Sequence, residues 1–130
     1  MKTVLDFLKK AGTYYLATMD GDQPRVRPFG TINLFDGKLY IQSGRKKEVA
    51  KQIKANPKVE LSAFDGNTWI RVAATLVEDN RAEAQESLLE AYPSLRNMYA
   101  VNDGNNIVYY LKDATAVFST FGGEPRKVKF

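Results

Sequence analysis

The sequence predicts an α+β fold dominated by β-structure: an antiparallel barrel of six to seven strands, closed or nearly closed, with a few flanking helices. Three observations support this fold class. Several short runs rich in β-branched and aromatic residues alternate in polarity along the chain. Asp-Gly turn sequences separate neighbouring runs, as in antiparallel hairpins. Only one helix lies between strands early in the chain, which disfavours a doubly wound α/β fold.

The elements expected in chain order are a helix over 4–11, strands over 14–19, 25–35 and 38–43, a helix over about 46–55, strands over 59–64 and 68–77, a helix over 80–92, a short helical piece near 95–99, strands over 107–111 and 115–120, and a polar tail over 122–127. Gly12 ends the first helix, and the second ends at Asn56 because a residue before proline avoids the helical region. Asn80 is expected to cap the third helix, with Glu83 completing a capping box. Because the 130 residues contain no linker or repeat, a single domain over residues 1–130 is expected.

The chain contains neither cysteine nor histidine, which excludes several kinds of site. A disulfide framework, a thiolate, a zinc site of the usual type and a His-ligated haem all need those residues, as does a Ser-His or Cys-His pair. A chain this poor in reactive groups either binds a ligand or relies on a cofactor. The net charge of +4 fits an anionic ligand and is too small to argue for nucleic acid. No signal peptide or membrane span is recognisable, so we expect a cytoplasmic protein without membrane contact.

The segment Ser43-Gly44-Arg45-Lys46-Lys47 lies between a predicted strand and a predicted helix. Free backbone N–H groups at a helix start, a serine hydroxyl and several cations together favour phosphate binding. Gly44 would let the main chain approach a ligand closely. The alternative interpretation is a basic turn that only keeps the surface soluble.

The strand around Pro28 adds further candidates. Alternation places Arg25, Arg27 and Phe29 on one face and Val26 and Pro28 on the other. Cations beside an aromatic ring would form a wall for an aromatic phosphate ester, although an exposed face with incidental arginines fits equally well. Because proline lacks a backbone donor, this strand is expected at a sheet edge or with a bulge.

The same argument from alternation applies to the single tryptophan, Trp69. Its neighbours Ile70 and Val72 begin a regular inward-facing series, so Trp69 and Arg71 point away from the core. A tryptophan outside the core of a barrel favours an interface or a ligand site. Packing beneath a helix is the alternative.

Several segments together resemble a known family. They are residues 24–30, residues 37–43, the pair Lys46-Lys47, residues 56–61 and residues 121–125. They resemble the pyridoxamine 5′-phosphate oxidase-like FMN-binding split-barrel family, and are most similar to its small bacterial members related to general stress proteins and nitroimidazole-resistance proteins. The resemblance covers nearly the whole chain and keeps the order of the elements.

In that family FMN lies in a cleft at the dimer interface. The resemblance therefore implies a split barrel that forms a homodimer, holds FMN non-covalently, and serves as an FMN-dependent oxidoreductase or redox carrier for a small molecule. It implies these cofactor-binding residues: Arg27, Pro28 and Phe29 alongside the isoalloxazine ring, Gln42 and Ser43 by the ring and ribityl chain, Lys46 and Lys47 near the phosphate, and Trp69 reaching over from the second subunit. No catalytic side chain and no metal site is expected.

The chain departs from the family pattern in two places. The basic pair Lys46-Lys47 is displaced toward the loop, which leaves open which lysine contacts the phosphate. Family members that oxidise pyridoxamine phosphate hold their substrate with a C-terminal arginine and histidine, and this chain has no histidine. We therefore do not expect that reaction. The alternatives are a binding module for single-stranded nucleic acid and a barrel that carries haem or a deazaflavin.

Overall fold

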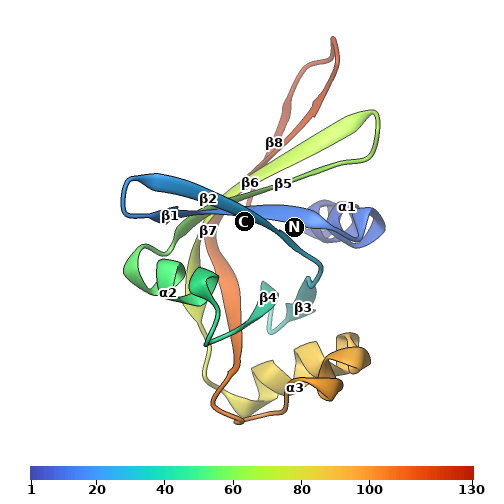
Figure 1. Ribbon diagram of the computed structural model, residues 1–130. Coiled ribbons are helices and arrows are strands. Elements are labelled where there is room, and N and C mark those ends of the chain that lie inside the picture. The colour runs from blue at the N-terminus through green and yellow to red at the C-terminus, as the bar shows by residue number, and fades with distance from the viewer.

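A computed structural model describes all of residues 1–130 (Figure 1). Its elements are α1 (Lys2–Ala11), β1 (Tyr14–Asp20), β2 (Gln23–Phe29), β3 (Asn33–Phe35), β4 (Lys38–Gly44), α2 (Glu48–Ala55), β5 (Lys58–Phe64), β6 (Thr68–Glu78), α3 (Ala82–Ala91), a 3-10 helix (Pro93–Asn97), β7 (Asn106–Thr120) and β8 (Arg126–Lys129).

All strand pairs are antiparallel and form one sheet in the order β2-β1-β5-β6-β7-β4-β3, with β8 paired to β7. The central strand β6 turns Ile70, Val72 and Leu76 inward, where they are buried in the main hydrophobic core. The regular alternation of strand residues therefore fixes which face of the sheet is covered. The predicted fold class, a mostly β antiparallel split barrel with flanking helices, is confirmed.

The predicted strand over 25–35 is in fact two strands. β2 pairs only with β1, and β3 pairs only with β4, so the two lie at opposite edges of the sheet. Residues 30–32 cross between these edges, which is where the barrel is split. The hydroxyl of Tyr14 donates to the carbonyl of Thr31 (2.6 Å), and the amide of Ile32 donates to the hydroxyl of Tyr92 (3.0 Å). These two tyrosines hold the crossing segment in place.

The edge position expected for the proline-containing strand is also confirmed, because β2 has a neighbour on one side only. A two-residue turn, Gly21-Asp22, joins β1 to β2, with Asp20 opposite Gln23. In such a hairpin the first pair exchanges hydrogen bonds, and the pairing type then alternates along the ladder. Pro24 and Pro28 therefore occupy positions whose backbone faces the free edge, where a missing N–H costs no ladder bond.

The end of the chain differs from prediction in two respects. A single strand, β7, replaces the two strands expected over 107–111 and 115–120. Asp113, with φ of 52°, lies where the register against β6 shifts, so a bulge marks the expected break without ending the strand. The expected polar tail contributes β8, whose four residues pair with β7. Tails of mixed charge carry little strand signal, and the pairing arises from the neighbouring strand.

Figure 1 shows how the other elements surround the sheet. The β5–β6 and β7–β8 hairpins project together beyond the barrel, and α3 lies at the opposite end. α2 buries Val49, Ala50 and Ile53 against the sheet. None of the helices has the length and apolar character that a membrane crossing requires.

The start of α3 is held by an ion pair in place of the expected side-chain cap. Its N-cap residue is Arg81, without a side-chain cap bond, so the prediction for Asn80 and Glu83 is wrong. The buried carboxylate of Asp79 accepts from the Arg81 guanidinium (2.9 Å), from the Arg81 amide (3.1 Å) and from the hydroxyl of Tyr40 (2.6 Å). Asp79, two positions before the N-cap, therefore accepts a backbone hydrogen bond at the start of the helix.

We predict that Asp79 makes folding stability depend on acid pH. The hydrogen bond from the Arg81 side chain has the largest effect on the pKa of Asp79. Together with the hydrogen bond from Tyr40, it lowers this pKa from 3.8 to about 2. Its contribution to stability is thus complete above its unfolded pKa and is lost as pH falls from about 4 through about 2. The free energy of unfolding, measured with urea across this range, should fall more steeply for the unaltered protein than for Asp79→Asn. Asp6→Asn, at an exposed site, is the control, and equal slopes for the unaltered protein and Asp79→Asn would contradict the prediction.

Candidate functional site

Arg27 extends from the edge strand β2 over the covered face of the sheet. In the β1–β2 register it lies opposite Leu16, and its neighbours Arg25 and Phe29 lie opposite Thr18 and Tyr14. Because Leu16, Thr18 and Tyr14 are buried, the predicted alternation is confirmed. Phe29 packs against Tyr14, with ring centroids 6.0 Å apart. Arg27 is half-buried.

The guanidinium of Arg27 has only neutral partners. It donates to the carbonyl of Leu16 (3.1 Å), to Oγ1 of Thr18 (2.7 Å) and to Oε1 of Gln52 (2.6 Å). No carboxylate forms an ion pair with it, in contrast to Arg25, which pairs with Asp20 at 3.2 Å. Burial, and then the nearby charge of Arg25, lower the pKa of Arg27. The chain therefore holds a partly desolvated positive charge that it does not neutralise itself.

The segment between β4 and α2 brings further positive charge to the same region. Lys46 and Lys47 are exposed and take part in no ion pair, whereas Arg45 pairs with Glu78 at 2.8 Å. Lys47 is the N-cap of α2 and provides no side-chain cap, so the first backbone donors of the helix remain available. Gln52, which contacts Arg27, lies one turn beyond the first helical residue, Glu48, on the same side of α2. The structure thus brings Arg27 close to the first turns of α2.

Gly44 makes a close approach that the sequence did not indicate. A Cβ atom at this position would lie 2.8 Å from the hydroxyl of Tyr99. The close approach is therefore made by a tyrosine of the same chain, where we had expected a ligand. Asn105 holds the same turn, since its carbonyl accepts from the amide of Arg45 (2.6 Å) and its side-chain oxygen accepts from the amide of Lys46 (3.0 Å).

Gln42 and Ser43 are both buried near the end of β4 and point to opposite faces. The side-chain amide of Gln42 donates to the carbonyl of Ser43 (2.9 Å) and to Oδ1 of Asn106 (3.0 Å). The donors of this amide are therefore already engaged within the chain. The Nδ2 group of Asn106 is buried without a partner. Ser43 lies on the covered face, as Arg27 does.

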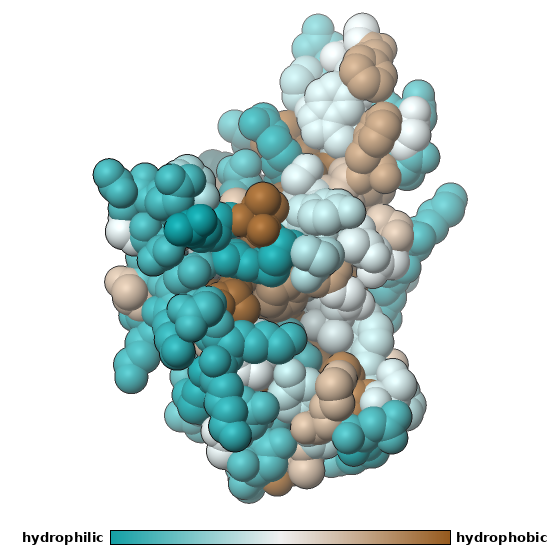
Figure 2. Space-filling model, in the orientation of Figure 1, coloured by the Kyte–Doolittle hydropathy of each residue, from teal (hydrophilic) through white to brown (hydrophobic).

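Trp69 is in a different place. It lies on the projecting β5–β6 hairpin, half-buried, on the face of the sheet opposite to Arg27. Its ring centroid is 5.0 Å from that of Phe121 and 6.5 Å from that of Phe64. Phe121 is 77% exposed and Phe64 is 56% exposed. We call these three residues the aromatic patch, and Figure 2 shows apolar side chains gathered on the projecting hairpins. Within one chain, Trp69 does not join Arg27 and α2.

Sequence reasoning missed Thr18, Gln52 and Phe121. Thr18 gave a signal, because it is polar on the otherwise apolar inward face of β1. Gln52 gave none, because its contact with Arg27 joins residues 25 positions apart. Phe121 lies between the strand expected over 115–120 and the polar tail expected over 122–127, so nothing local indicated that it would pack against Trp69.

The chain matches the family model described as pyridoxamine 5′-phosphate oxidase over residues 1–93. No curated protein matches it. Among solved structures, a NimC/NimA family protein from Clostridium acetobutylicum is 46% identical, with a TM-score of 0.95, over 100% of this chain and 92% of that protein.

Two more distant structures show the same fold. General stress protein 26 from Bacillus anthracis is 17% identical, with a TM-score of 0.77, over 99% of this chain and 98% of that protein. A pyridoxamine 5′-phosphate oxidase-related, FMN-binding protein from Nostoc punctiforme is 13% identical, with a TM-score of 0.64, over 96% of this chain and 90% of that protein. Taken with the family model and the 46% identity over the full chain, these likenesses confirm the resemblance noted in the sequence: the chain belongs to the pyridoxamine 5′-phosphate oxidase family.

Proposed function

We propose that the protein binds FMN non-covalently and holds its phosphate between Arg27 and the start of α2. The observation that carries this proposal is the half-buried guanidinium of Arg27, whose hydrogen-bond partners are all neutral. A positive charge removed from water is costly unless an anion accompanies it. A phosphate ester is such an anion, and the FMN-binding relative from Nostoc punctiforme supports a flavin nucleotide as its carrier.

We call the proposed phosphate-binding site the phosphate seat. It consists of Arg27, Lys46, Lys47 and the first backbone N–H groups of α2. The two lysines lack ion-pair partners in the chain, and the first N–H groups of α2 lack a side-chain cap. Helix N-termini favour anions through these free donors and through the helix dipole. Thr18 and Gln52 fix the guanidinium of Arg27 in position, so the seat loses little conformational entropy when the phosphate arrives.

The flavin ring is proposed to lie along β2 beside Pro28 and Phe29. The free edge of β2 offers backbone carbonyl groups, with N–H groups only where the residue is not proline. Gln42 and Ser43 would approach the ring and the ribityl chain from the end of β4. The side-chain amide of Gln42 already donates to Ser43 and Asn106, and its backbone amide donates to Oγ1 of Thr31 (3.0 Å), so its contribution would come from its side-chain oxygen as an acceptor.

We further propose that a homodimer completes the site. The aromatic patch lies on the face opposite to Arg27, so Trp69 can reach a flavin only when it comes from the second subunit. Tyr15 and Val26, which are also exposed, lie on the same outer face. Exposed apolar residues grouped in this way are typical of an interaction surface.

When bound, FMN would supply electron or hydride transfer, which no side chain of this protein can supply. The chain would position the cofactor, neutralise its phosphate and shield its ring from water. We therefore propose an FMN-dependent oxidoreductase or redox carrier that acts on a small molecule. We do not propose oxidation of pyridoxamine phosphate, because the chain contains no histidine with which to hold that substrate as the family does.

The first prediction concerns the cofactor itself. The full-length protein, titrated with FMN, should perturb the visible flavin absorption band and quench flavin fluorescence in a saturable way. FMN should bind more tightly than riboflavin, because the seat contacts the phosphate. A protein that leaves both flavins unperturbed would contradict the proposal, and saturable binding of haem alone would favour the alternative.

The second prediction concerns the phosphate seat. Replacing both Lys46 and Lys47 by alanine should weaken the binding of FMN and leave the affinity for riboflavin nearly unchanged. The reason is that each charge-assisted contact with the phosphate contributes about 1.5–3 kcal/mol. Lys9→Ala with Lys10→Ala, an adjacent exposed pair on α1, removes the same charge elsewhere and should affect neither ligand. Equal losses for FMN and riboflavin in the Lys46/Lys47 variant would place the phosphate elsewhere.

The third prediction concerns the aromatic patch. Trp69→Ala should shift the dimer toward monomer in sedimentation equilibrium and should weaken FMN binding in parallel. Both effects are expected because the Trp69 side chain would contact the second subunit and its flavin. Met98→Ala, a substitution at an exposed apolar residue outside the patch, should change neither. A Trp69→Ala protein that remains as dimeric as the unaltered protein, with unchanged FMN affinity, would remove Trp69 from the site.

A further inference from the structure

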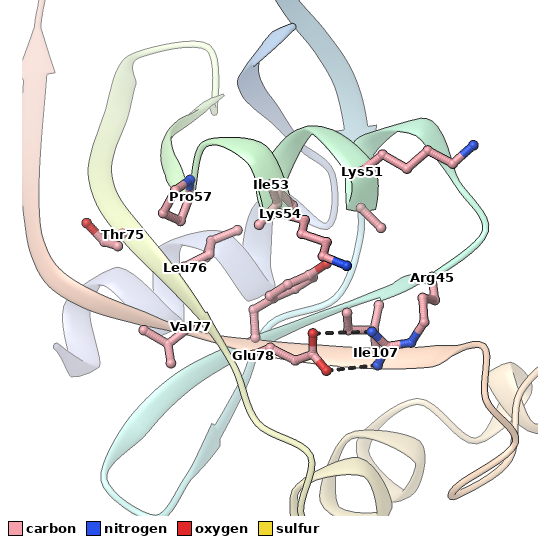
Figure 3. Close-up of a pocket in the computed structure, with 12 residues that line it drawn as sticks. Arg45, Lys51, Ile53, Lys54, Pro57, Thr75, Leu76, Val77, Glu78 and Ile107 are labelled. Atoms are coloured by element: carbon pink, nitrogen blue, oxygen red, sulfur yellow. Dashed lines mark hydrogen bonds and ion pairs between the residues drawn. The ribbon is translucent and has the colours of Figure 1, made fainter.

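A hollow lies on the side of α2 away from Arg27, between this helix and the strands β6 and β7 (Figure 3). Its volume is about 570 Å³, which is within the usual range for small-molecule sites. Ile53 of α2, Leu76 of β6 and Ile107 of β7 form apolar parts of its wall, and all three are buried. We call this space the α2–β7 cavity. Its lining includes neither Arg27 nor Lys46 nor Lys47.

Tyr109 gives the α2–β7 cavity an unused hydrogen-bond donor. The residue lines the cavity and is only 3% exposed, yet its hydroxyl has no hydrogen-bond partner in the chain. Nδ2 of Asn106 is the one fully enclosed side-chain polar atom that lacks a partner, so the Tyr109 hydroxyl opens onto the cavity, where a ligand can reach it. Burial, and then the charge of Glu78, raise the pKa of Tyr109 to about 12, so the phenol keeps its proton across the neutral range. A ligand that accepts a hydrogen bond would satisfy this group.

The rim of the α2–β7 cavity is positively charged. Lys51 and Lys54 extend from α2, and Arg45 lies across the opening. Arg45 forms a two-pronged ion pair with Glu78, at 2.8 and 3.3 Å, and Glu78 is the only acidic residue in the lining. Figure 3 shows Lys54 extending over the space that this ion pair borders. Lys51 pairs with Glu48 at 3.1 Å, which leaves Lys54 as the cation of the lining without an ion pair, and an unpaired cation favours an anionic ligand.

We propose that the α2–β7 cavity is a second binding site, for a small monocarboxylic acid with an apolar body. The carboxylate would accept hydrogen bonds from the Tyr109 hydroxyl and from the ammonium of Lys54. The aromatic or branched aliphatic body would rest on Ile53, Leu76 and Ile107. A single carboxylate suits the rim, because Glu78 remains there and would repel an anion of higher charge.

This site is separate from the proposed phosphate seat and does not depend on it. Arg27 reaches α2 through Gln52, on the side of the helix that packs toward β1. The α2–β7 cavity lies on the side toward β6 and β7. A flavin in the seat and an acid in the cavity would therefore flank the same helix without competing.

The test uses benzoate as the probe and calorimetric titration of the full-length protein. Benzoate should bind saturably, with a Kd of about 1 mM or tighter. Benzyl alcohol, which keeps the ring and lacks the charge, should bind at least about tenfold more weakly. Saturating FMN should leave the benzoate affinity unchanged.

Two substitutions test the assigned contacts. Tyr109→Phe removes only the hydroxyl and should weaken benzoate about tenfold or more. Lys54→Gln should weaken it to a similar extent. Tyr110→Phe, the adjacent tyrosine on the opposite face of β7, and Lys58→Gln, an exposed lysine outside the cavity, are matched controls that should bind normally. The thermal midpoint of each variant shows whether it is folded.

Several outcomes would overturn the proposal. Absence of saturable benzoate binding, or equal binding of benzyl alcohol, would mean that the cavity does not select an acid. Normal benzoate binding by both Tyr109→Phe and Lys54→Gln would place the acid elsewhere. Loss of benzoate on addition of FMN would mean that the cavity belongs to the flavin site.

Discussion

The regular alternation of β6 is the constraint on which the other features depend. This central strand places Ile70, Val72 and Leu76 in the core, and its two ladders fix the registers of β5 and β7. A shift of one residue would turn the core residues outward and Trp69 inward. The same register therefore determines the core, the aromatic patch on the outer face and the apolar wall of the α2–β7 cavity.

The second organising feature is an imbalance of charge around α2. On the side toward β1, Arg27 is surrounded by neutral acceptors, and on the side toward β7, Lys54 and Arg45 outnumber Glu78. Glu78 pairs with Arg45 and Glu48 pairs with Lys51, which leaves Arg27 and Lys54 without a carboxylate partner. The arrangement fits a helix that presents positive charge to ligands on two sides.

The sequence was informative wherever the cause of a structure is local. Alternation gave the faces of β2 and β6, Asp-Gly turns gave the hairpins, and Pro28 predicted an edge strand. The failures arise from contacts between distant residues. β8 exists because β7 lies beside it, and the start of α3 is held by Asp79 because Tyr40 and Arg81 donate to that carboxylate.

The candidate site, too, was predictable only where its cause is local. The side chains of Arg27 and Trp69 lie on the faces that alternation predicted. The contact of Arg27 with Gln52, and the close approach of Tyr99 to Gly44, depend on packing between segments far apart in the sequence. No local pattern reports such packing. The resemblance to the family supplied the expected cofactor and its binding residues, which the residue patterns alone left open.

The two prolines of β2 have a consequence for assembly. With Pro24 and Pro28 facing the free edge, the strand cannot offer a continuous row of donors to another sheet. The β2 edge is therefore a poor template for edge-to-edge joining into an extended sheet, the route by which β-rich proteins grow into filaments. Association then depends on side chains of the outer face, and contacts of that kind can form a closed dimer that adds no further copies.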